Sequence, residues 1–262
     1  MPIDKFMSAE RAVALIRDGD TVGLIGGGGG LVEASCLFSA VEKRFLSTGH
    51  PRDLFVIHAL GIGDRKTRGM NCFAHEGMVR RVIGGHWVWS PRMQALARDE
   101  KIEAYVLPGG VAMQLFREIG AGRPGLFTHV GLGTFVDPRL EGGKLNKRTT
   151  EDLVEVVNID GHELLRYKPF PINVALIRGS QADATGNISL QQEPANLDIY
   201  AVALAAHNSG GKVIAQVREA VDVGALPARA VRVPGAIVDA VVVDPSQSMT
   251  YDIAYDPTMS GE

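Results

Sequence analysis

Residues Thr21-Val22-Gly23-Leu24-Ile25-Gly26-Gly27-Gly28-Gly29-Gly30 join a short apolar segment to a run of five glycines. The apolar segment has the length and composition of a buried β-strand. After the glycines, apolar residues recur at helical spacing until Gly49, at Leu31, Ala34, Phe38, Val41 and Phe45. A strand, a glycine loop and a helix in this order form the repeating unit of parallel α/β sheets. We therefore expect an α/β fold in which the glycine run follows the carboxyl end of a strand.

The same unit recurs on both sides of this stretch. Before it, Ser8 is expected to cap a short helix that ends at Asp18-Gly19-Asp20. After it, we expect buried strands, each followed by glycines, at 54–59, 79–83 and 104–107, and helices at 91–100 and 111–119. Glycine, proline and charged residues dominate 120–147, which predicts a long loop region. Beyond this region we expect strands at 163–167, 174–178, 212–217 and 237–243, and a helix at 198–207.

These elements predict one domain over residues 1–262, built on an open, mostly parallel sheet with helices on both faces. The tail from about residue 245 is expected to be irregular. Apolar residues make up 45% of the chain and charged residues 22%, which excludes a disordered chain or a coiled coil. The 27 Lys and Arg against 30 Asp and Glu give a net charge of −3 without any block of like charges, so we expect neither a nucleic acid nor a membrane as a partner.

The cysteines and the start of the chain indicate the cellular compartment. Cys36 and Cys72 do not have the spacing of metal ligands, and we expect both to be free thiols. Residues 1–5 include an acid and lead into an amphipathic segment, unlike the apolar core of a secretion signal. The sequence therefore predicts a cytoplasmic protein without a metal site.

The glycine run is the first candidate binding site, because open α/β sheets bind ligands at the carboxyl ends of their strands. Its backbone N–H groups suit a phosphate, a carboxylate or an oxyanion. A tight turn with close helix packing is the alternative. No register of the run gives G-x-G-x-x-G, and no Gly-Lys-Ser/Thr follows it, so neither a dinucleotide site nor a P-loop is supported.

Further candidates lie at other expected strand ends. The glycine-rich loops at 109–110, 120–125 and 131–134 would converge on one edge of a parallel sheet, unless they are flexible connections. His58 and His129 are expected to be structural histidines, and Trp87 and Trp89 a half-buried packing face. Glu33, Glu76 and Glu118 are the acids nearest the glycine loops, and the helix dipole alone would explain a glutamate in the first turn, as expected for Glu33. Asn187 is expected to bond backbone in a turn.

The order of these blocks resembles the α half of a family I CoA-transferase, the group of the short-chain acyl-CoA:acetate, propionate and 3-oxoacid CoA-transferases. The resemblance covers essentially the whole chain. It rests on Asp18-Gly19-Asp20-Thr21-Val22 with the glycine run and Glu33, Leu107-Pro108-Gly109-Gly110 with Gly120-Ala121-Gly122-Arg123-Pro124, Gly131-Leu132-Gly133-Thr134, and Ala182-Asp183-Ala184-Thr185-Gly186-Asn187 with Asn196. Segments 80–85 and 87–91 are most similar to the acetate/propionate branch, whose members are usually single chains of two homologous halves.

This resemblance implies the CoA-transferase (NagB/RpiA-like) fold and a ping-pong transfer of CoA between an acyl-CoA and a short-chain carboxylate. CoA and acyl-CoA would be substrates, and no cofactor is implied. In the family, the glutamate that attacks the thioester belongs to the β half. We therefore expect no catalytic nucleophile in this chain, little activity without a β half or β subunit as its partner, and an oligomeric enzyme of short-chain fatty acid or ketone body metabolism.

The resemblance also suggests pocket residues, and the sequence departs from the family at three of these places. The family's Gly-Gly-Phe loop is replaced by Gly26, Gly27, Gly28, Gly29 and Gly30, which lack the aromatic residue. A glutamine of the 3-oxoacid branch aligns with Gly109, while Gln114 falls on the expected helix, and an asparagine of that branch aligns with Ala59. Backbone N–H groups of Gly109, Gly110 and the glycine run are therefore the expected oxyanion donors. The other pocket candidates are Gln114, Glu33, His58, Ala59, Gly131, Thr134 and Asn187.

Two other functions compete with this hypothesis. A stand-alone module that binds acyl-CoA or a carboxylate would keep the fold without the chemistry. A sugar-phosphate isomerase or deaminase of related architecture would need a convergent acid/base set, which the sequence does not show. A missing β half would leave an apolar face exposed, so the first hypothesis also predicts such a face.

Overall fold

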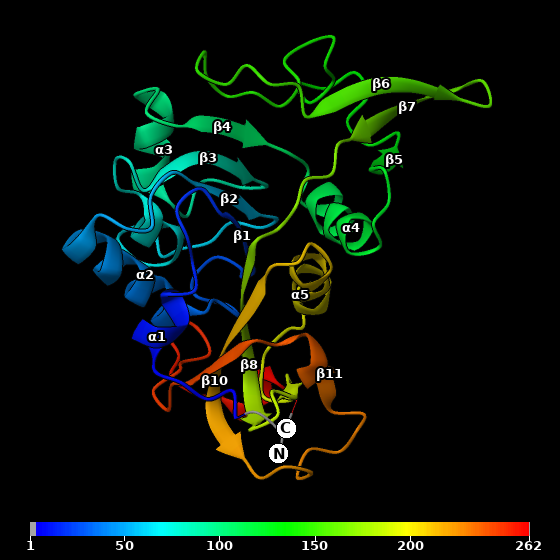
Figure 1. Cartoon of the computed structure of the whole chain (residues 1–262). Helices are drawn as coiled ribbons and strands as arrows, with labels where there is room; N and C mark the ends of the chain where they lie inside the picture. The colour runs from blue at the N-terminus through cyan, green and yellow to red at the C-terminus, as the bar shows by residue number, and fades with distance from the viewer. Residues whose placement is uncertain (1–3, 262) are drawn as a thin grey trace.

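A computed structural model describes residues 4–261 and shows a central, mostly parallel sheet (Figure 1). Its main strands follow the order β12-β10-β8-β1-β2-β3-β4, and each neighbouring pair is parallel. β9 pairs antiparallel with β8, and β11 with β9. The strands are β1 (Thr21–Leu24), β2 (Leu54–His58), β3 (Val79–Gly84), β4 (Glu103–Val106), β8 (Val174–Asp183), β9 (Ile188–Ser189), β10 (Lys212–Val221), β11 (Val231–Val233) and β12 (Ala240–Val243). The predicted α/β class and mostly parallel sheet are confirmed.

Helices cover both faces of this sheet, as the alternation of side chains along its strands requires. In β2, Phe55 and Ile57 join the core under α4 and α5, while Leu54 and Val56 join the core under α1, α2 and α3. The helices are α1 (Ala9–Val13), α2 (Ser35–Thr48), α3 (Pro91–Arg98), α4 (Gly109–Gly120) and α5 (Ile199–Asn208), with short 3-10 turns η1 (Gly69–Phe73), η2 (Gly235–Ile237) and η3 (Pro257–Met259).

A second, three-stranded sheet projects beside α4, at the top right of Figure 1. It consists of β5 (Leu126–Thr128), β6 (Val154–Ile159) and β7 (His162–Tyr167), paired antiparallel in the order β5-β7-β6. The strand expected at 163–167 is present as β7, but it belongs to this small sheet and not to the parallel one. The tight turn at Asp160 and Gly161, both at positive φ, folds β7 back onto β6 instead.

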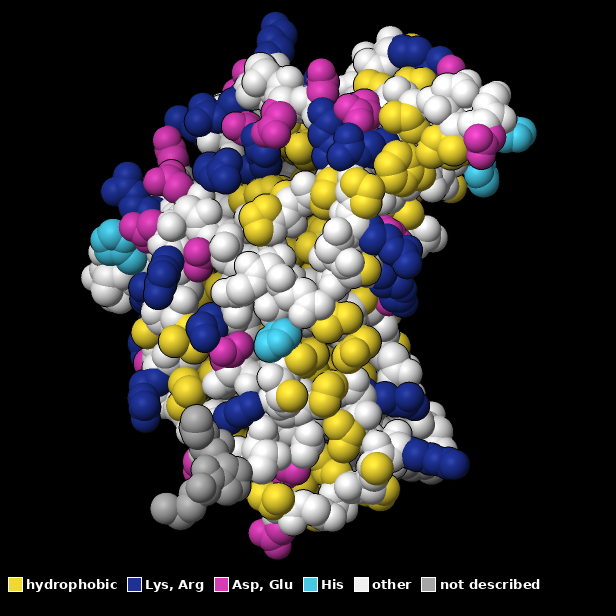
Figure 2. All heavy atoms as spheres, turned by 45° about the vertical axis from the view of Figure 1, so that its right-hand side comes forward, with side chains coloured by type: hydrophobic (Ala, Val, Ile, Leu, Met, Phe, Trp, Pro, Cys, Tyr) yellow, Lys and Arg dark blue, Asp and Glu magenta, His cyan; other side chains and the backbone are white. Residues whose placement is uncertain are grey.

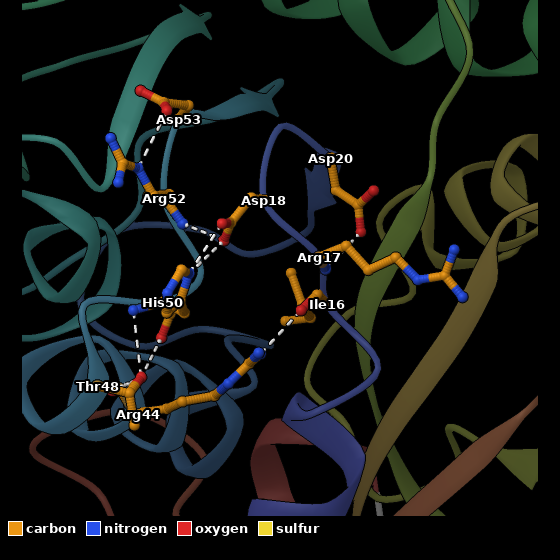
Figure 3. A network of polar contacts seen from close by, with 9 residues as sticks. All are labelled: Ile16, Arg17, Asp18, Asp20, Arg44, Thr48, His50, Arg52 and Asp53. Atoms are coloured by element: carbon orange, nitrogen blue, oxygen red, sulfur yellow. Dashed lines mark hydrogen bonds and ion pairs between the residues drawn. The ribbon is translucent and has the colours of Figure 1, made fainter.

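The block Asp18-Gly19-Asp20 lies at the amino end of β1, so it is at the opposite end of the strand from the glycine run. α1 ends at Val13 rather than at this block. The Asp18 carboxylate accepts hydrogen bonds from the Arg52 backbone N–H (2.9 Å) and from His50 (2.8 Å) (Figure 3). Arg44, near the end of α2, donates to the Ile16 carbonyl at 2.8 Å. These contacts join the chain before β1 to the chain before β2.

Ser8 caps α1 as expected, since its side chain accepts a hydrogen bond from the Arg11 N–H. Within residues 4–261, no helix is long and apolar enough to cross a membrane. The prediction of a cytoplasmic protein used residues 1–5, of which residues 1–3 lie outside the described residues.

Candidate functional site

The glycine run folds into a tight loop at the carboxyl end of β1. Gly27 and Leu31 exchange backbone hydrogen bonds of 2.7 and 3.1 Å, and Gly29 and Gly30 adopt positive φ. The Gly29 N–H donates to the Gly63 carbonyl of the neighbouring loop at 2.8 Å. A Cβ atom at Gly28 would overlap the Trp89 ring, so this glycine permits close packing. The loop delays α2, which begins at Ser35 and not at Leu31 as expected.

Three more loops meet the glycine run at this edge of the sheet. A Cβ atom at Gly85 would overlap the Ala59 carbonyl oxygen, and one at Gly109 would lie 2.8 Å from it. The loops after β2 and β3 and the start of α4 are therefore in close contact. Parallel strands bring their carboxyl ends to one edge, which explains this convergence.

The amino terminus of α4 presents free N–H groups at the same edge. Pro108 occupies its N-cap position, and no side chain caps this end. The first N–H groups of an α-helix have no intrahelical acceptor, which gives this end a partial positive charge. Gly110 is exposed, with open space where a side chain would point. Gly109 and Gly110 can therefore donate hydrogen bonds to an anionic atom.

Glu33 lies before α2, and the expectation that it sits in the helix's first turn is wrong because α2 begins two residues later. Its carboxyl group is completely buried. It accepts hydrogen bonds from the Gly63 N–H (2.9 Å), the Tyr251 hydroxyl (2.6 Å) and, more weakly, the Gly30 N–H (3.3 Å). Burial raises the pKa of Glu33 to about 7, although these hydrogen bonds offset part of the effect.

His58 ends β2 and is completely buried. Its Nδ1 lies 2.6 Å from the Leu60 carbonyl oxygen, so Nδ1 carries the ring proton and donates a hydrogen bond to that oxygen. Burial lowers the pKa of His58 to about 4, so the ring is neutral at physiological pH. This arrangement holds the loop that carries Ala59, and it is the structural role that the sequence indicates.

Some of the predicted site residues do not lie at the edge of the sheet where the glycine run and the start of α4 meet. Gln114 is exposed on α4, and the 120–125 loop is at the far end of that helix, about 18 Å from its start at 1.5 Å per residue. The expected convergence of this loop with 109–110 is therefore wrong. Gly131 and Thr134 lie in the loop after β5, where the Thr134 hydroxyl donates to the Gly131 carbonyl.

Asn187 lies in the turn between β8 and β9, far along β8 from the part that pairs with β1. Its side-chain amide donates to Asp183 at 2.9 Å, and its Oδ1 accepts the Gly235 N–H at 2.9 Å. The Asn187 side chain is therefore engaged in a local turn.

Two aromatic residues complete the edge. Trp89 is half-buried, as expected for a packing face, whereas the sequence did not indicate a role for Tyr251. Trp89 packs against Gly28 and Gly61, and the Arg65 guanidinium lies 4.3 Å from its ring centre. Tyr251 comes from the tail. It borders a cavity of about 390 Å³ together with Ser35, Cys36, Ser39, Arg68, Gly69, Cys72, Asp244, Ser246 and Ser248. Over the described chain, no group of three or more His, Cys, Asp or Glu is placed to hold a metal ion.

Comparison with known proteins identifies the family. The family model described as "Coenzyme A transferase" matches residues 6–244. The chain belongs to the Coenzyme A transferase family. Its fold overlays with a TM-score of 0.97 on a crystal structure of the acyl-CoA transferase YdiF from Escherichia coli O157:H7, a thioester complex with CoA, at 41% identity. That alignment covers 100% of this chain and 51% of YdiF.

Two curated members of the Coenzyme A transferase family show how this chain relates to whole enzymes. The caffeate CoA-transferase of Acetobacterium woodii is 45% identical over 261 residues, which are 98% of this chain and 49% of that protein. The acetate CoA-transferase subunit alpha of Escherichia coli (strain K12) is 29% identical over 240 residues, 91% of this chain and 96% of that subunit. This chain therefore spans about half the length of the longer relatives and nearly the whole of a separate α subunit.

Proposed function

We propose that this chain is the α half of an acyl-CoA:carboxylate CoA-transferase that acts on short-chain acids. The proposal is carried by its near-complete overlay on one half of a CoA-transferase whose crystal structure is a thioester complex with CoA. An edge of four glycine-containing loops beside an uncapped helix terminus supports it, because that terminus suits the oxygen of a thioester as it becomes negative.

The proposed transfer proceeds through a glutamate carboxylate of the partner half. The carboxylate attacks the thioester carbonyl, the C–S bond breaks, and an acyl-glutamyl anhydride and CoA thiolate result. The thiolate then attacks the glutamyl carbonyl, which releases the first carboxylate and leaves a glutamyl-CoA thioester. The acceptor carboxylate reverses both steps and leaves as the new acyl-CoA, and the glutamate is regenerated.

The glutamates of this chain near glycine loops fit a nucleophile poorly. Glu33 is buried and its carboxyl group is engaged by three hydrogen bonds. Glu76 pairs with Lys101, and Glu118 pairs with Arg123 near the far end of α4. These positions favour a nucleophile supplied by a β half.

The proposed partner contacts an apolar face on and around the small sheet. Figure 2 shows hydrophobic side chains gathered beneath this projecting sheet and along the hollow face below it. Six exposed large apolar side chains belong to the sheet and its loops: Phe127, Val130, Phe135, Leu140, Leu145 and Ile159. A patch of this kind indicates a protein interface. The small sheet packs beside α4, so a β half seated here would also reach the glycine edge.

The oxyanion role of Gly109 is testable by removing a single N–H group. Proline is accepted at the first helical position, and Pro108 already has the extended conformation that a following proline requires. Gly109→Pro removes the donor, while Gly109→Ala adds a Cβ atom at the same place and keeps the donor. We expect kcat of the assembled enzyme to be about 100-fold lower for Gly109→Pro than for Gly109→Ala. Equal rates would rule out this N–H group as an oxyanion donor.

The function itself is tested by mixing this chain with the second half of YdiF, expressed separately. Propionyl-CoA and acetate are supplied, and acetyl-CoA is measured. Acetyl-CoA formed only by the mixture supports the proposal. Activity of this chain alone would assign the nucleophile to one of its own glutamates. Tight binding of acyl-CoA with no transfer in the mixture would favour the stand-alone binding module.

A further inference from the structure

The tail after β12 is fastened across the core rather than loosely attached. Gln247 is 3% exposed, and its amide donates to the Gly179 carbonyl (2.8 Å) and to Glu193 (2.9 Å). Met249 is completely buried, and hydrogen bonds between residues 249 and 254 and between 250 and 253 close a tight turn. This turn carries Tyr251 to the glycine run.

Tyr251 joins the tail to the glycine run in two ways. Its backbone N–H donates to the Gly29 carbonyl at 2.7 Å, and its hydroxyl donates to Glu33 at 2.6 Å. A Cβ atom at Gly30 would lie 2.8 Å from Tyr251, so the tail rests directly on the run. The other Glu33 oxygen accepts the N–H groups of Gly30 and Gly63. One carboxyl group therefore connects the tail with two of the loops at the site.

Charged groups surround this connection on several elements. The Arg68 guanidinium faces the Tyr251 ring at 5.1 Å, and Arg178 of β8 donates to the Glu33 backbone carbonyl at 3.3 Å. The Asp64 charge disfavours ionisation of Glu33, while Glu33 in turn disfavours the Cys72 thiolate. Glu193, which contacts Gln247 of the tail, is paired with Arg178.

We propose that Glu33 is a positioning residue: it holds the glycine run and fastens the tail 247–256 across that run, so that closing the tail buries the Glu33 carboxyl group. The inference rests on these contacts and not on the proposed transfer reaction.

The direction of the proton linkage follows from the burial of Glu33. In the closed arrangement, burial raises the pKa of Glu33 to about 7. Opening the tail admits water, which returns the pKa toward its ordinary value of 4.5. The closed state therefore binds the proton more tightly, and closure becomes less favourable as the pH rises from about 5 to above 7. Between pH 6 and pH 8 the ratio of closed to open molecules falls about tenfold.

Hydrogen exchange of the isolated chain tests this inference. The measured quantity is the protection factor of amides in 249–254, with the intrinsic pH dependence of exchange divided out. We expect protection of the tail to fall about tenfold from pH 6 to pH 8, and to be lower at both values than that of β8, whose amides exchange only when the whole fold opens. In Glu33→Gln the tail should be equally protected at both values. Asp252→Asn is the matched control, because it changes an exposed carboxyl group of the same tail, and the tenfold fall should remain.

Tyr251→Phe provides a second variant that leaves Glu33 in place. Losing the hydroxyl should lower tail protection at both pH values and keep its fall with pH. A tail whose protection in the unmodified chain does not change with pH would overturn the proposal. So would a fall with pH that persists in Glu33→Gln or disappears in Asp252→Asn.

Discussion

A single buried acid beside the glycine run, Glu33, makes the stability of the folded chain depend on pH. Its pKa is raised by burial from 4.5 to about 7, so the folded chain keeps this proton to a higher pH than the unfolded chain does. The stabilisation is fully present below about pH 4.5 and is lost as the pH rises through about 7. We expect this one group to lower the free energy of unfolding by roughly 3 kcal/mol between pH 4.5 and 8, at about 1.4 kcal/mol per pKa unit.

Urea unfolding of the chain and of Glu33→Gln at pH 5 and pH 8 measures this contribution. The amide does not titrate, so the stability of the variant relative to the unmodified chain should rise between the two values. Glu76→Gln is a suitable control, because Glu76 is exposed in a surface ion pair. A relative stability of Glu33→Gln that is the same at both pH values would contradict the assignment.

The surroundings of Glu33 explain why the sequence predicted this site only in part. The glycine run and its place at a strand end follow from local sequence pattern. So does the position of Glu33, which is close to the run in the sequence. Tyr251, whose hydroxyl completes the hydrogen bonds to the Glu33 carboxyl group, is 218 residues away from Glu33 in the sequence. Its contact depends on the path of an irregular tail, which no periodicity encodes. The same is true of Trp89, whose neighbours Gly28 and Gly61 belong to other loops.

At the scale of elements, the tail anchors α2 as well as the glycine run. The Gln216 side chain of β10 accepts the Cys36 N–H at the start of α2 (2.9 Å) and donates to Gln247 (2.9 Å). Gln247→Ala would remove one hydrogen bond from each of three buried residues, Gln216, Gly179 and Glu193. We expect the free energy of unfolding to fall by about 2 kcal/mol, measured by urea denaturation.

The exposed Gln191 provides the control for this substitution. Gln191→Ala should change stability by less than about 0.5 kcal/mol. If Gln247→Ala were as mild, the buried hydrogen bonds of the tail would contribute little to the fold.

Element boundaries show where local pattern was sufficient and where it failed. The strands of the parallel sheet were predicted because each contains a short apolar run, and because β1, β2, β3 and β4 lead into glycines. β6 was missed, although Asp160-Gly161 between two half-apolar segments is a hairpin signal. The start of α2 was placed too early because Leu31 and Val32 continue the helical spacing, whereas the Gly27–Leu31 hydrogen bonds hold them in the loop.

At the scale of the whole molecule, large apolar side chains remain exposed on the small sheet and its loops. The face on the small sheet is where we propose that a β half binds. Leu140 is 63% exposed there, so replacing it does not disturb the packed interior. Leu140→Glu places a charge in the proposed interface, and we expect the affinity for the second half of YdiF to fall at least tenfold, about 1.4 kcal/mol.

Leu46 offers a closely matched control on another part of the surface. It is 65% exposed and lies on α2, at the left of Figure 1 and away from the small sheet. Leu46→Glu introduces the same charge at the same exposure, so its affinity for the partner half, measured by titration calorimetry, should equal that of the unmodified chain. Equal losses from both substitutions would indicate a general effect of charge. A loss from Leu46→Glu alone would place the partner on the α2 side and contradict the proposed interface.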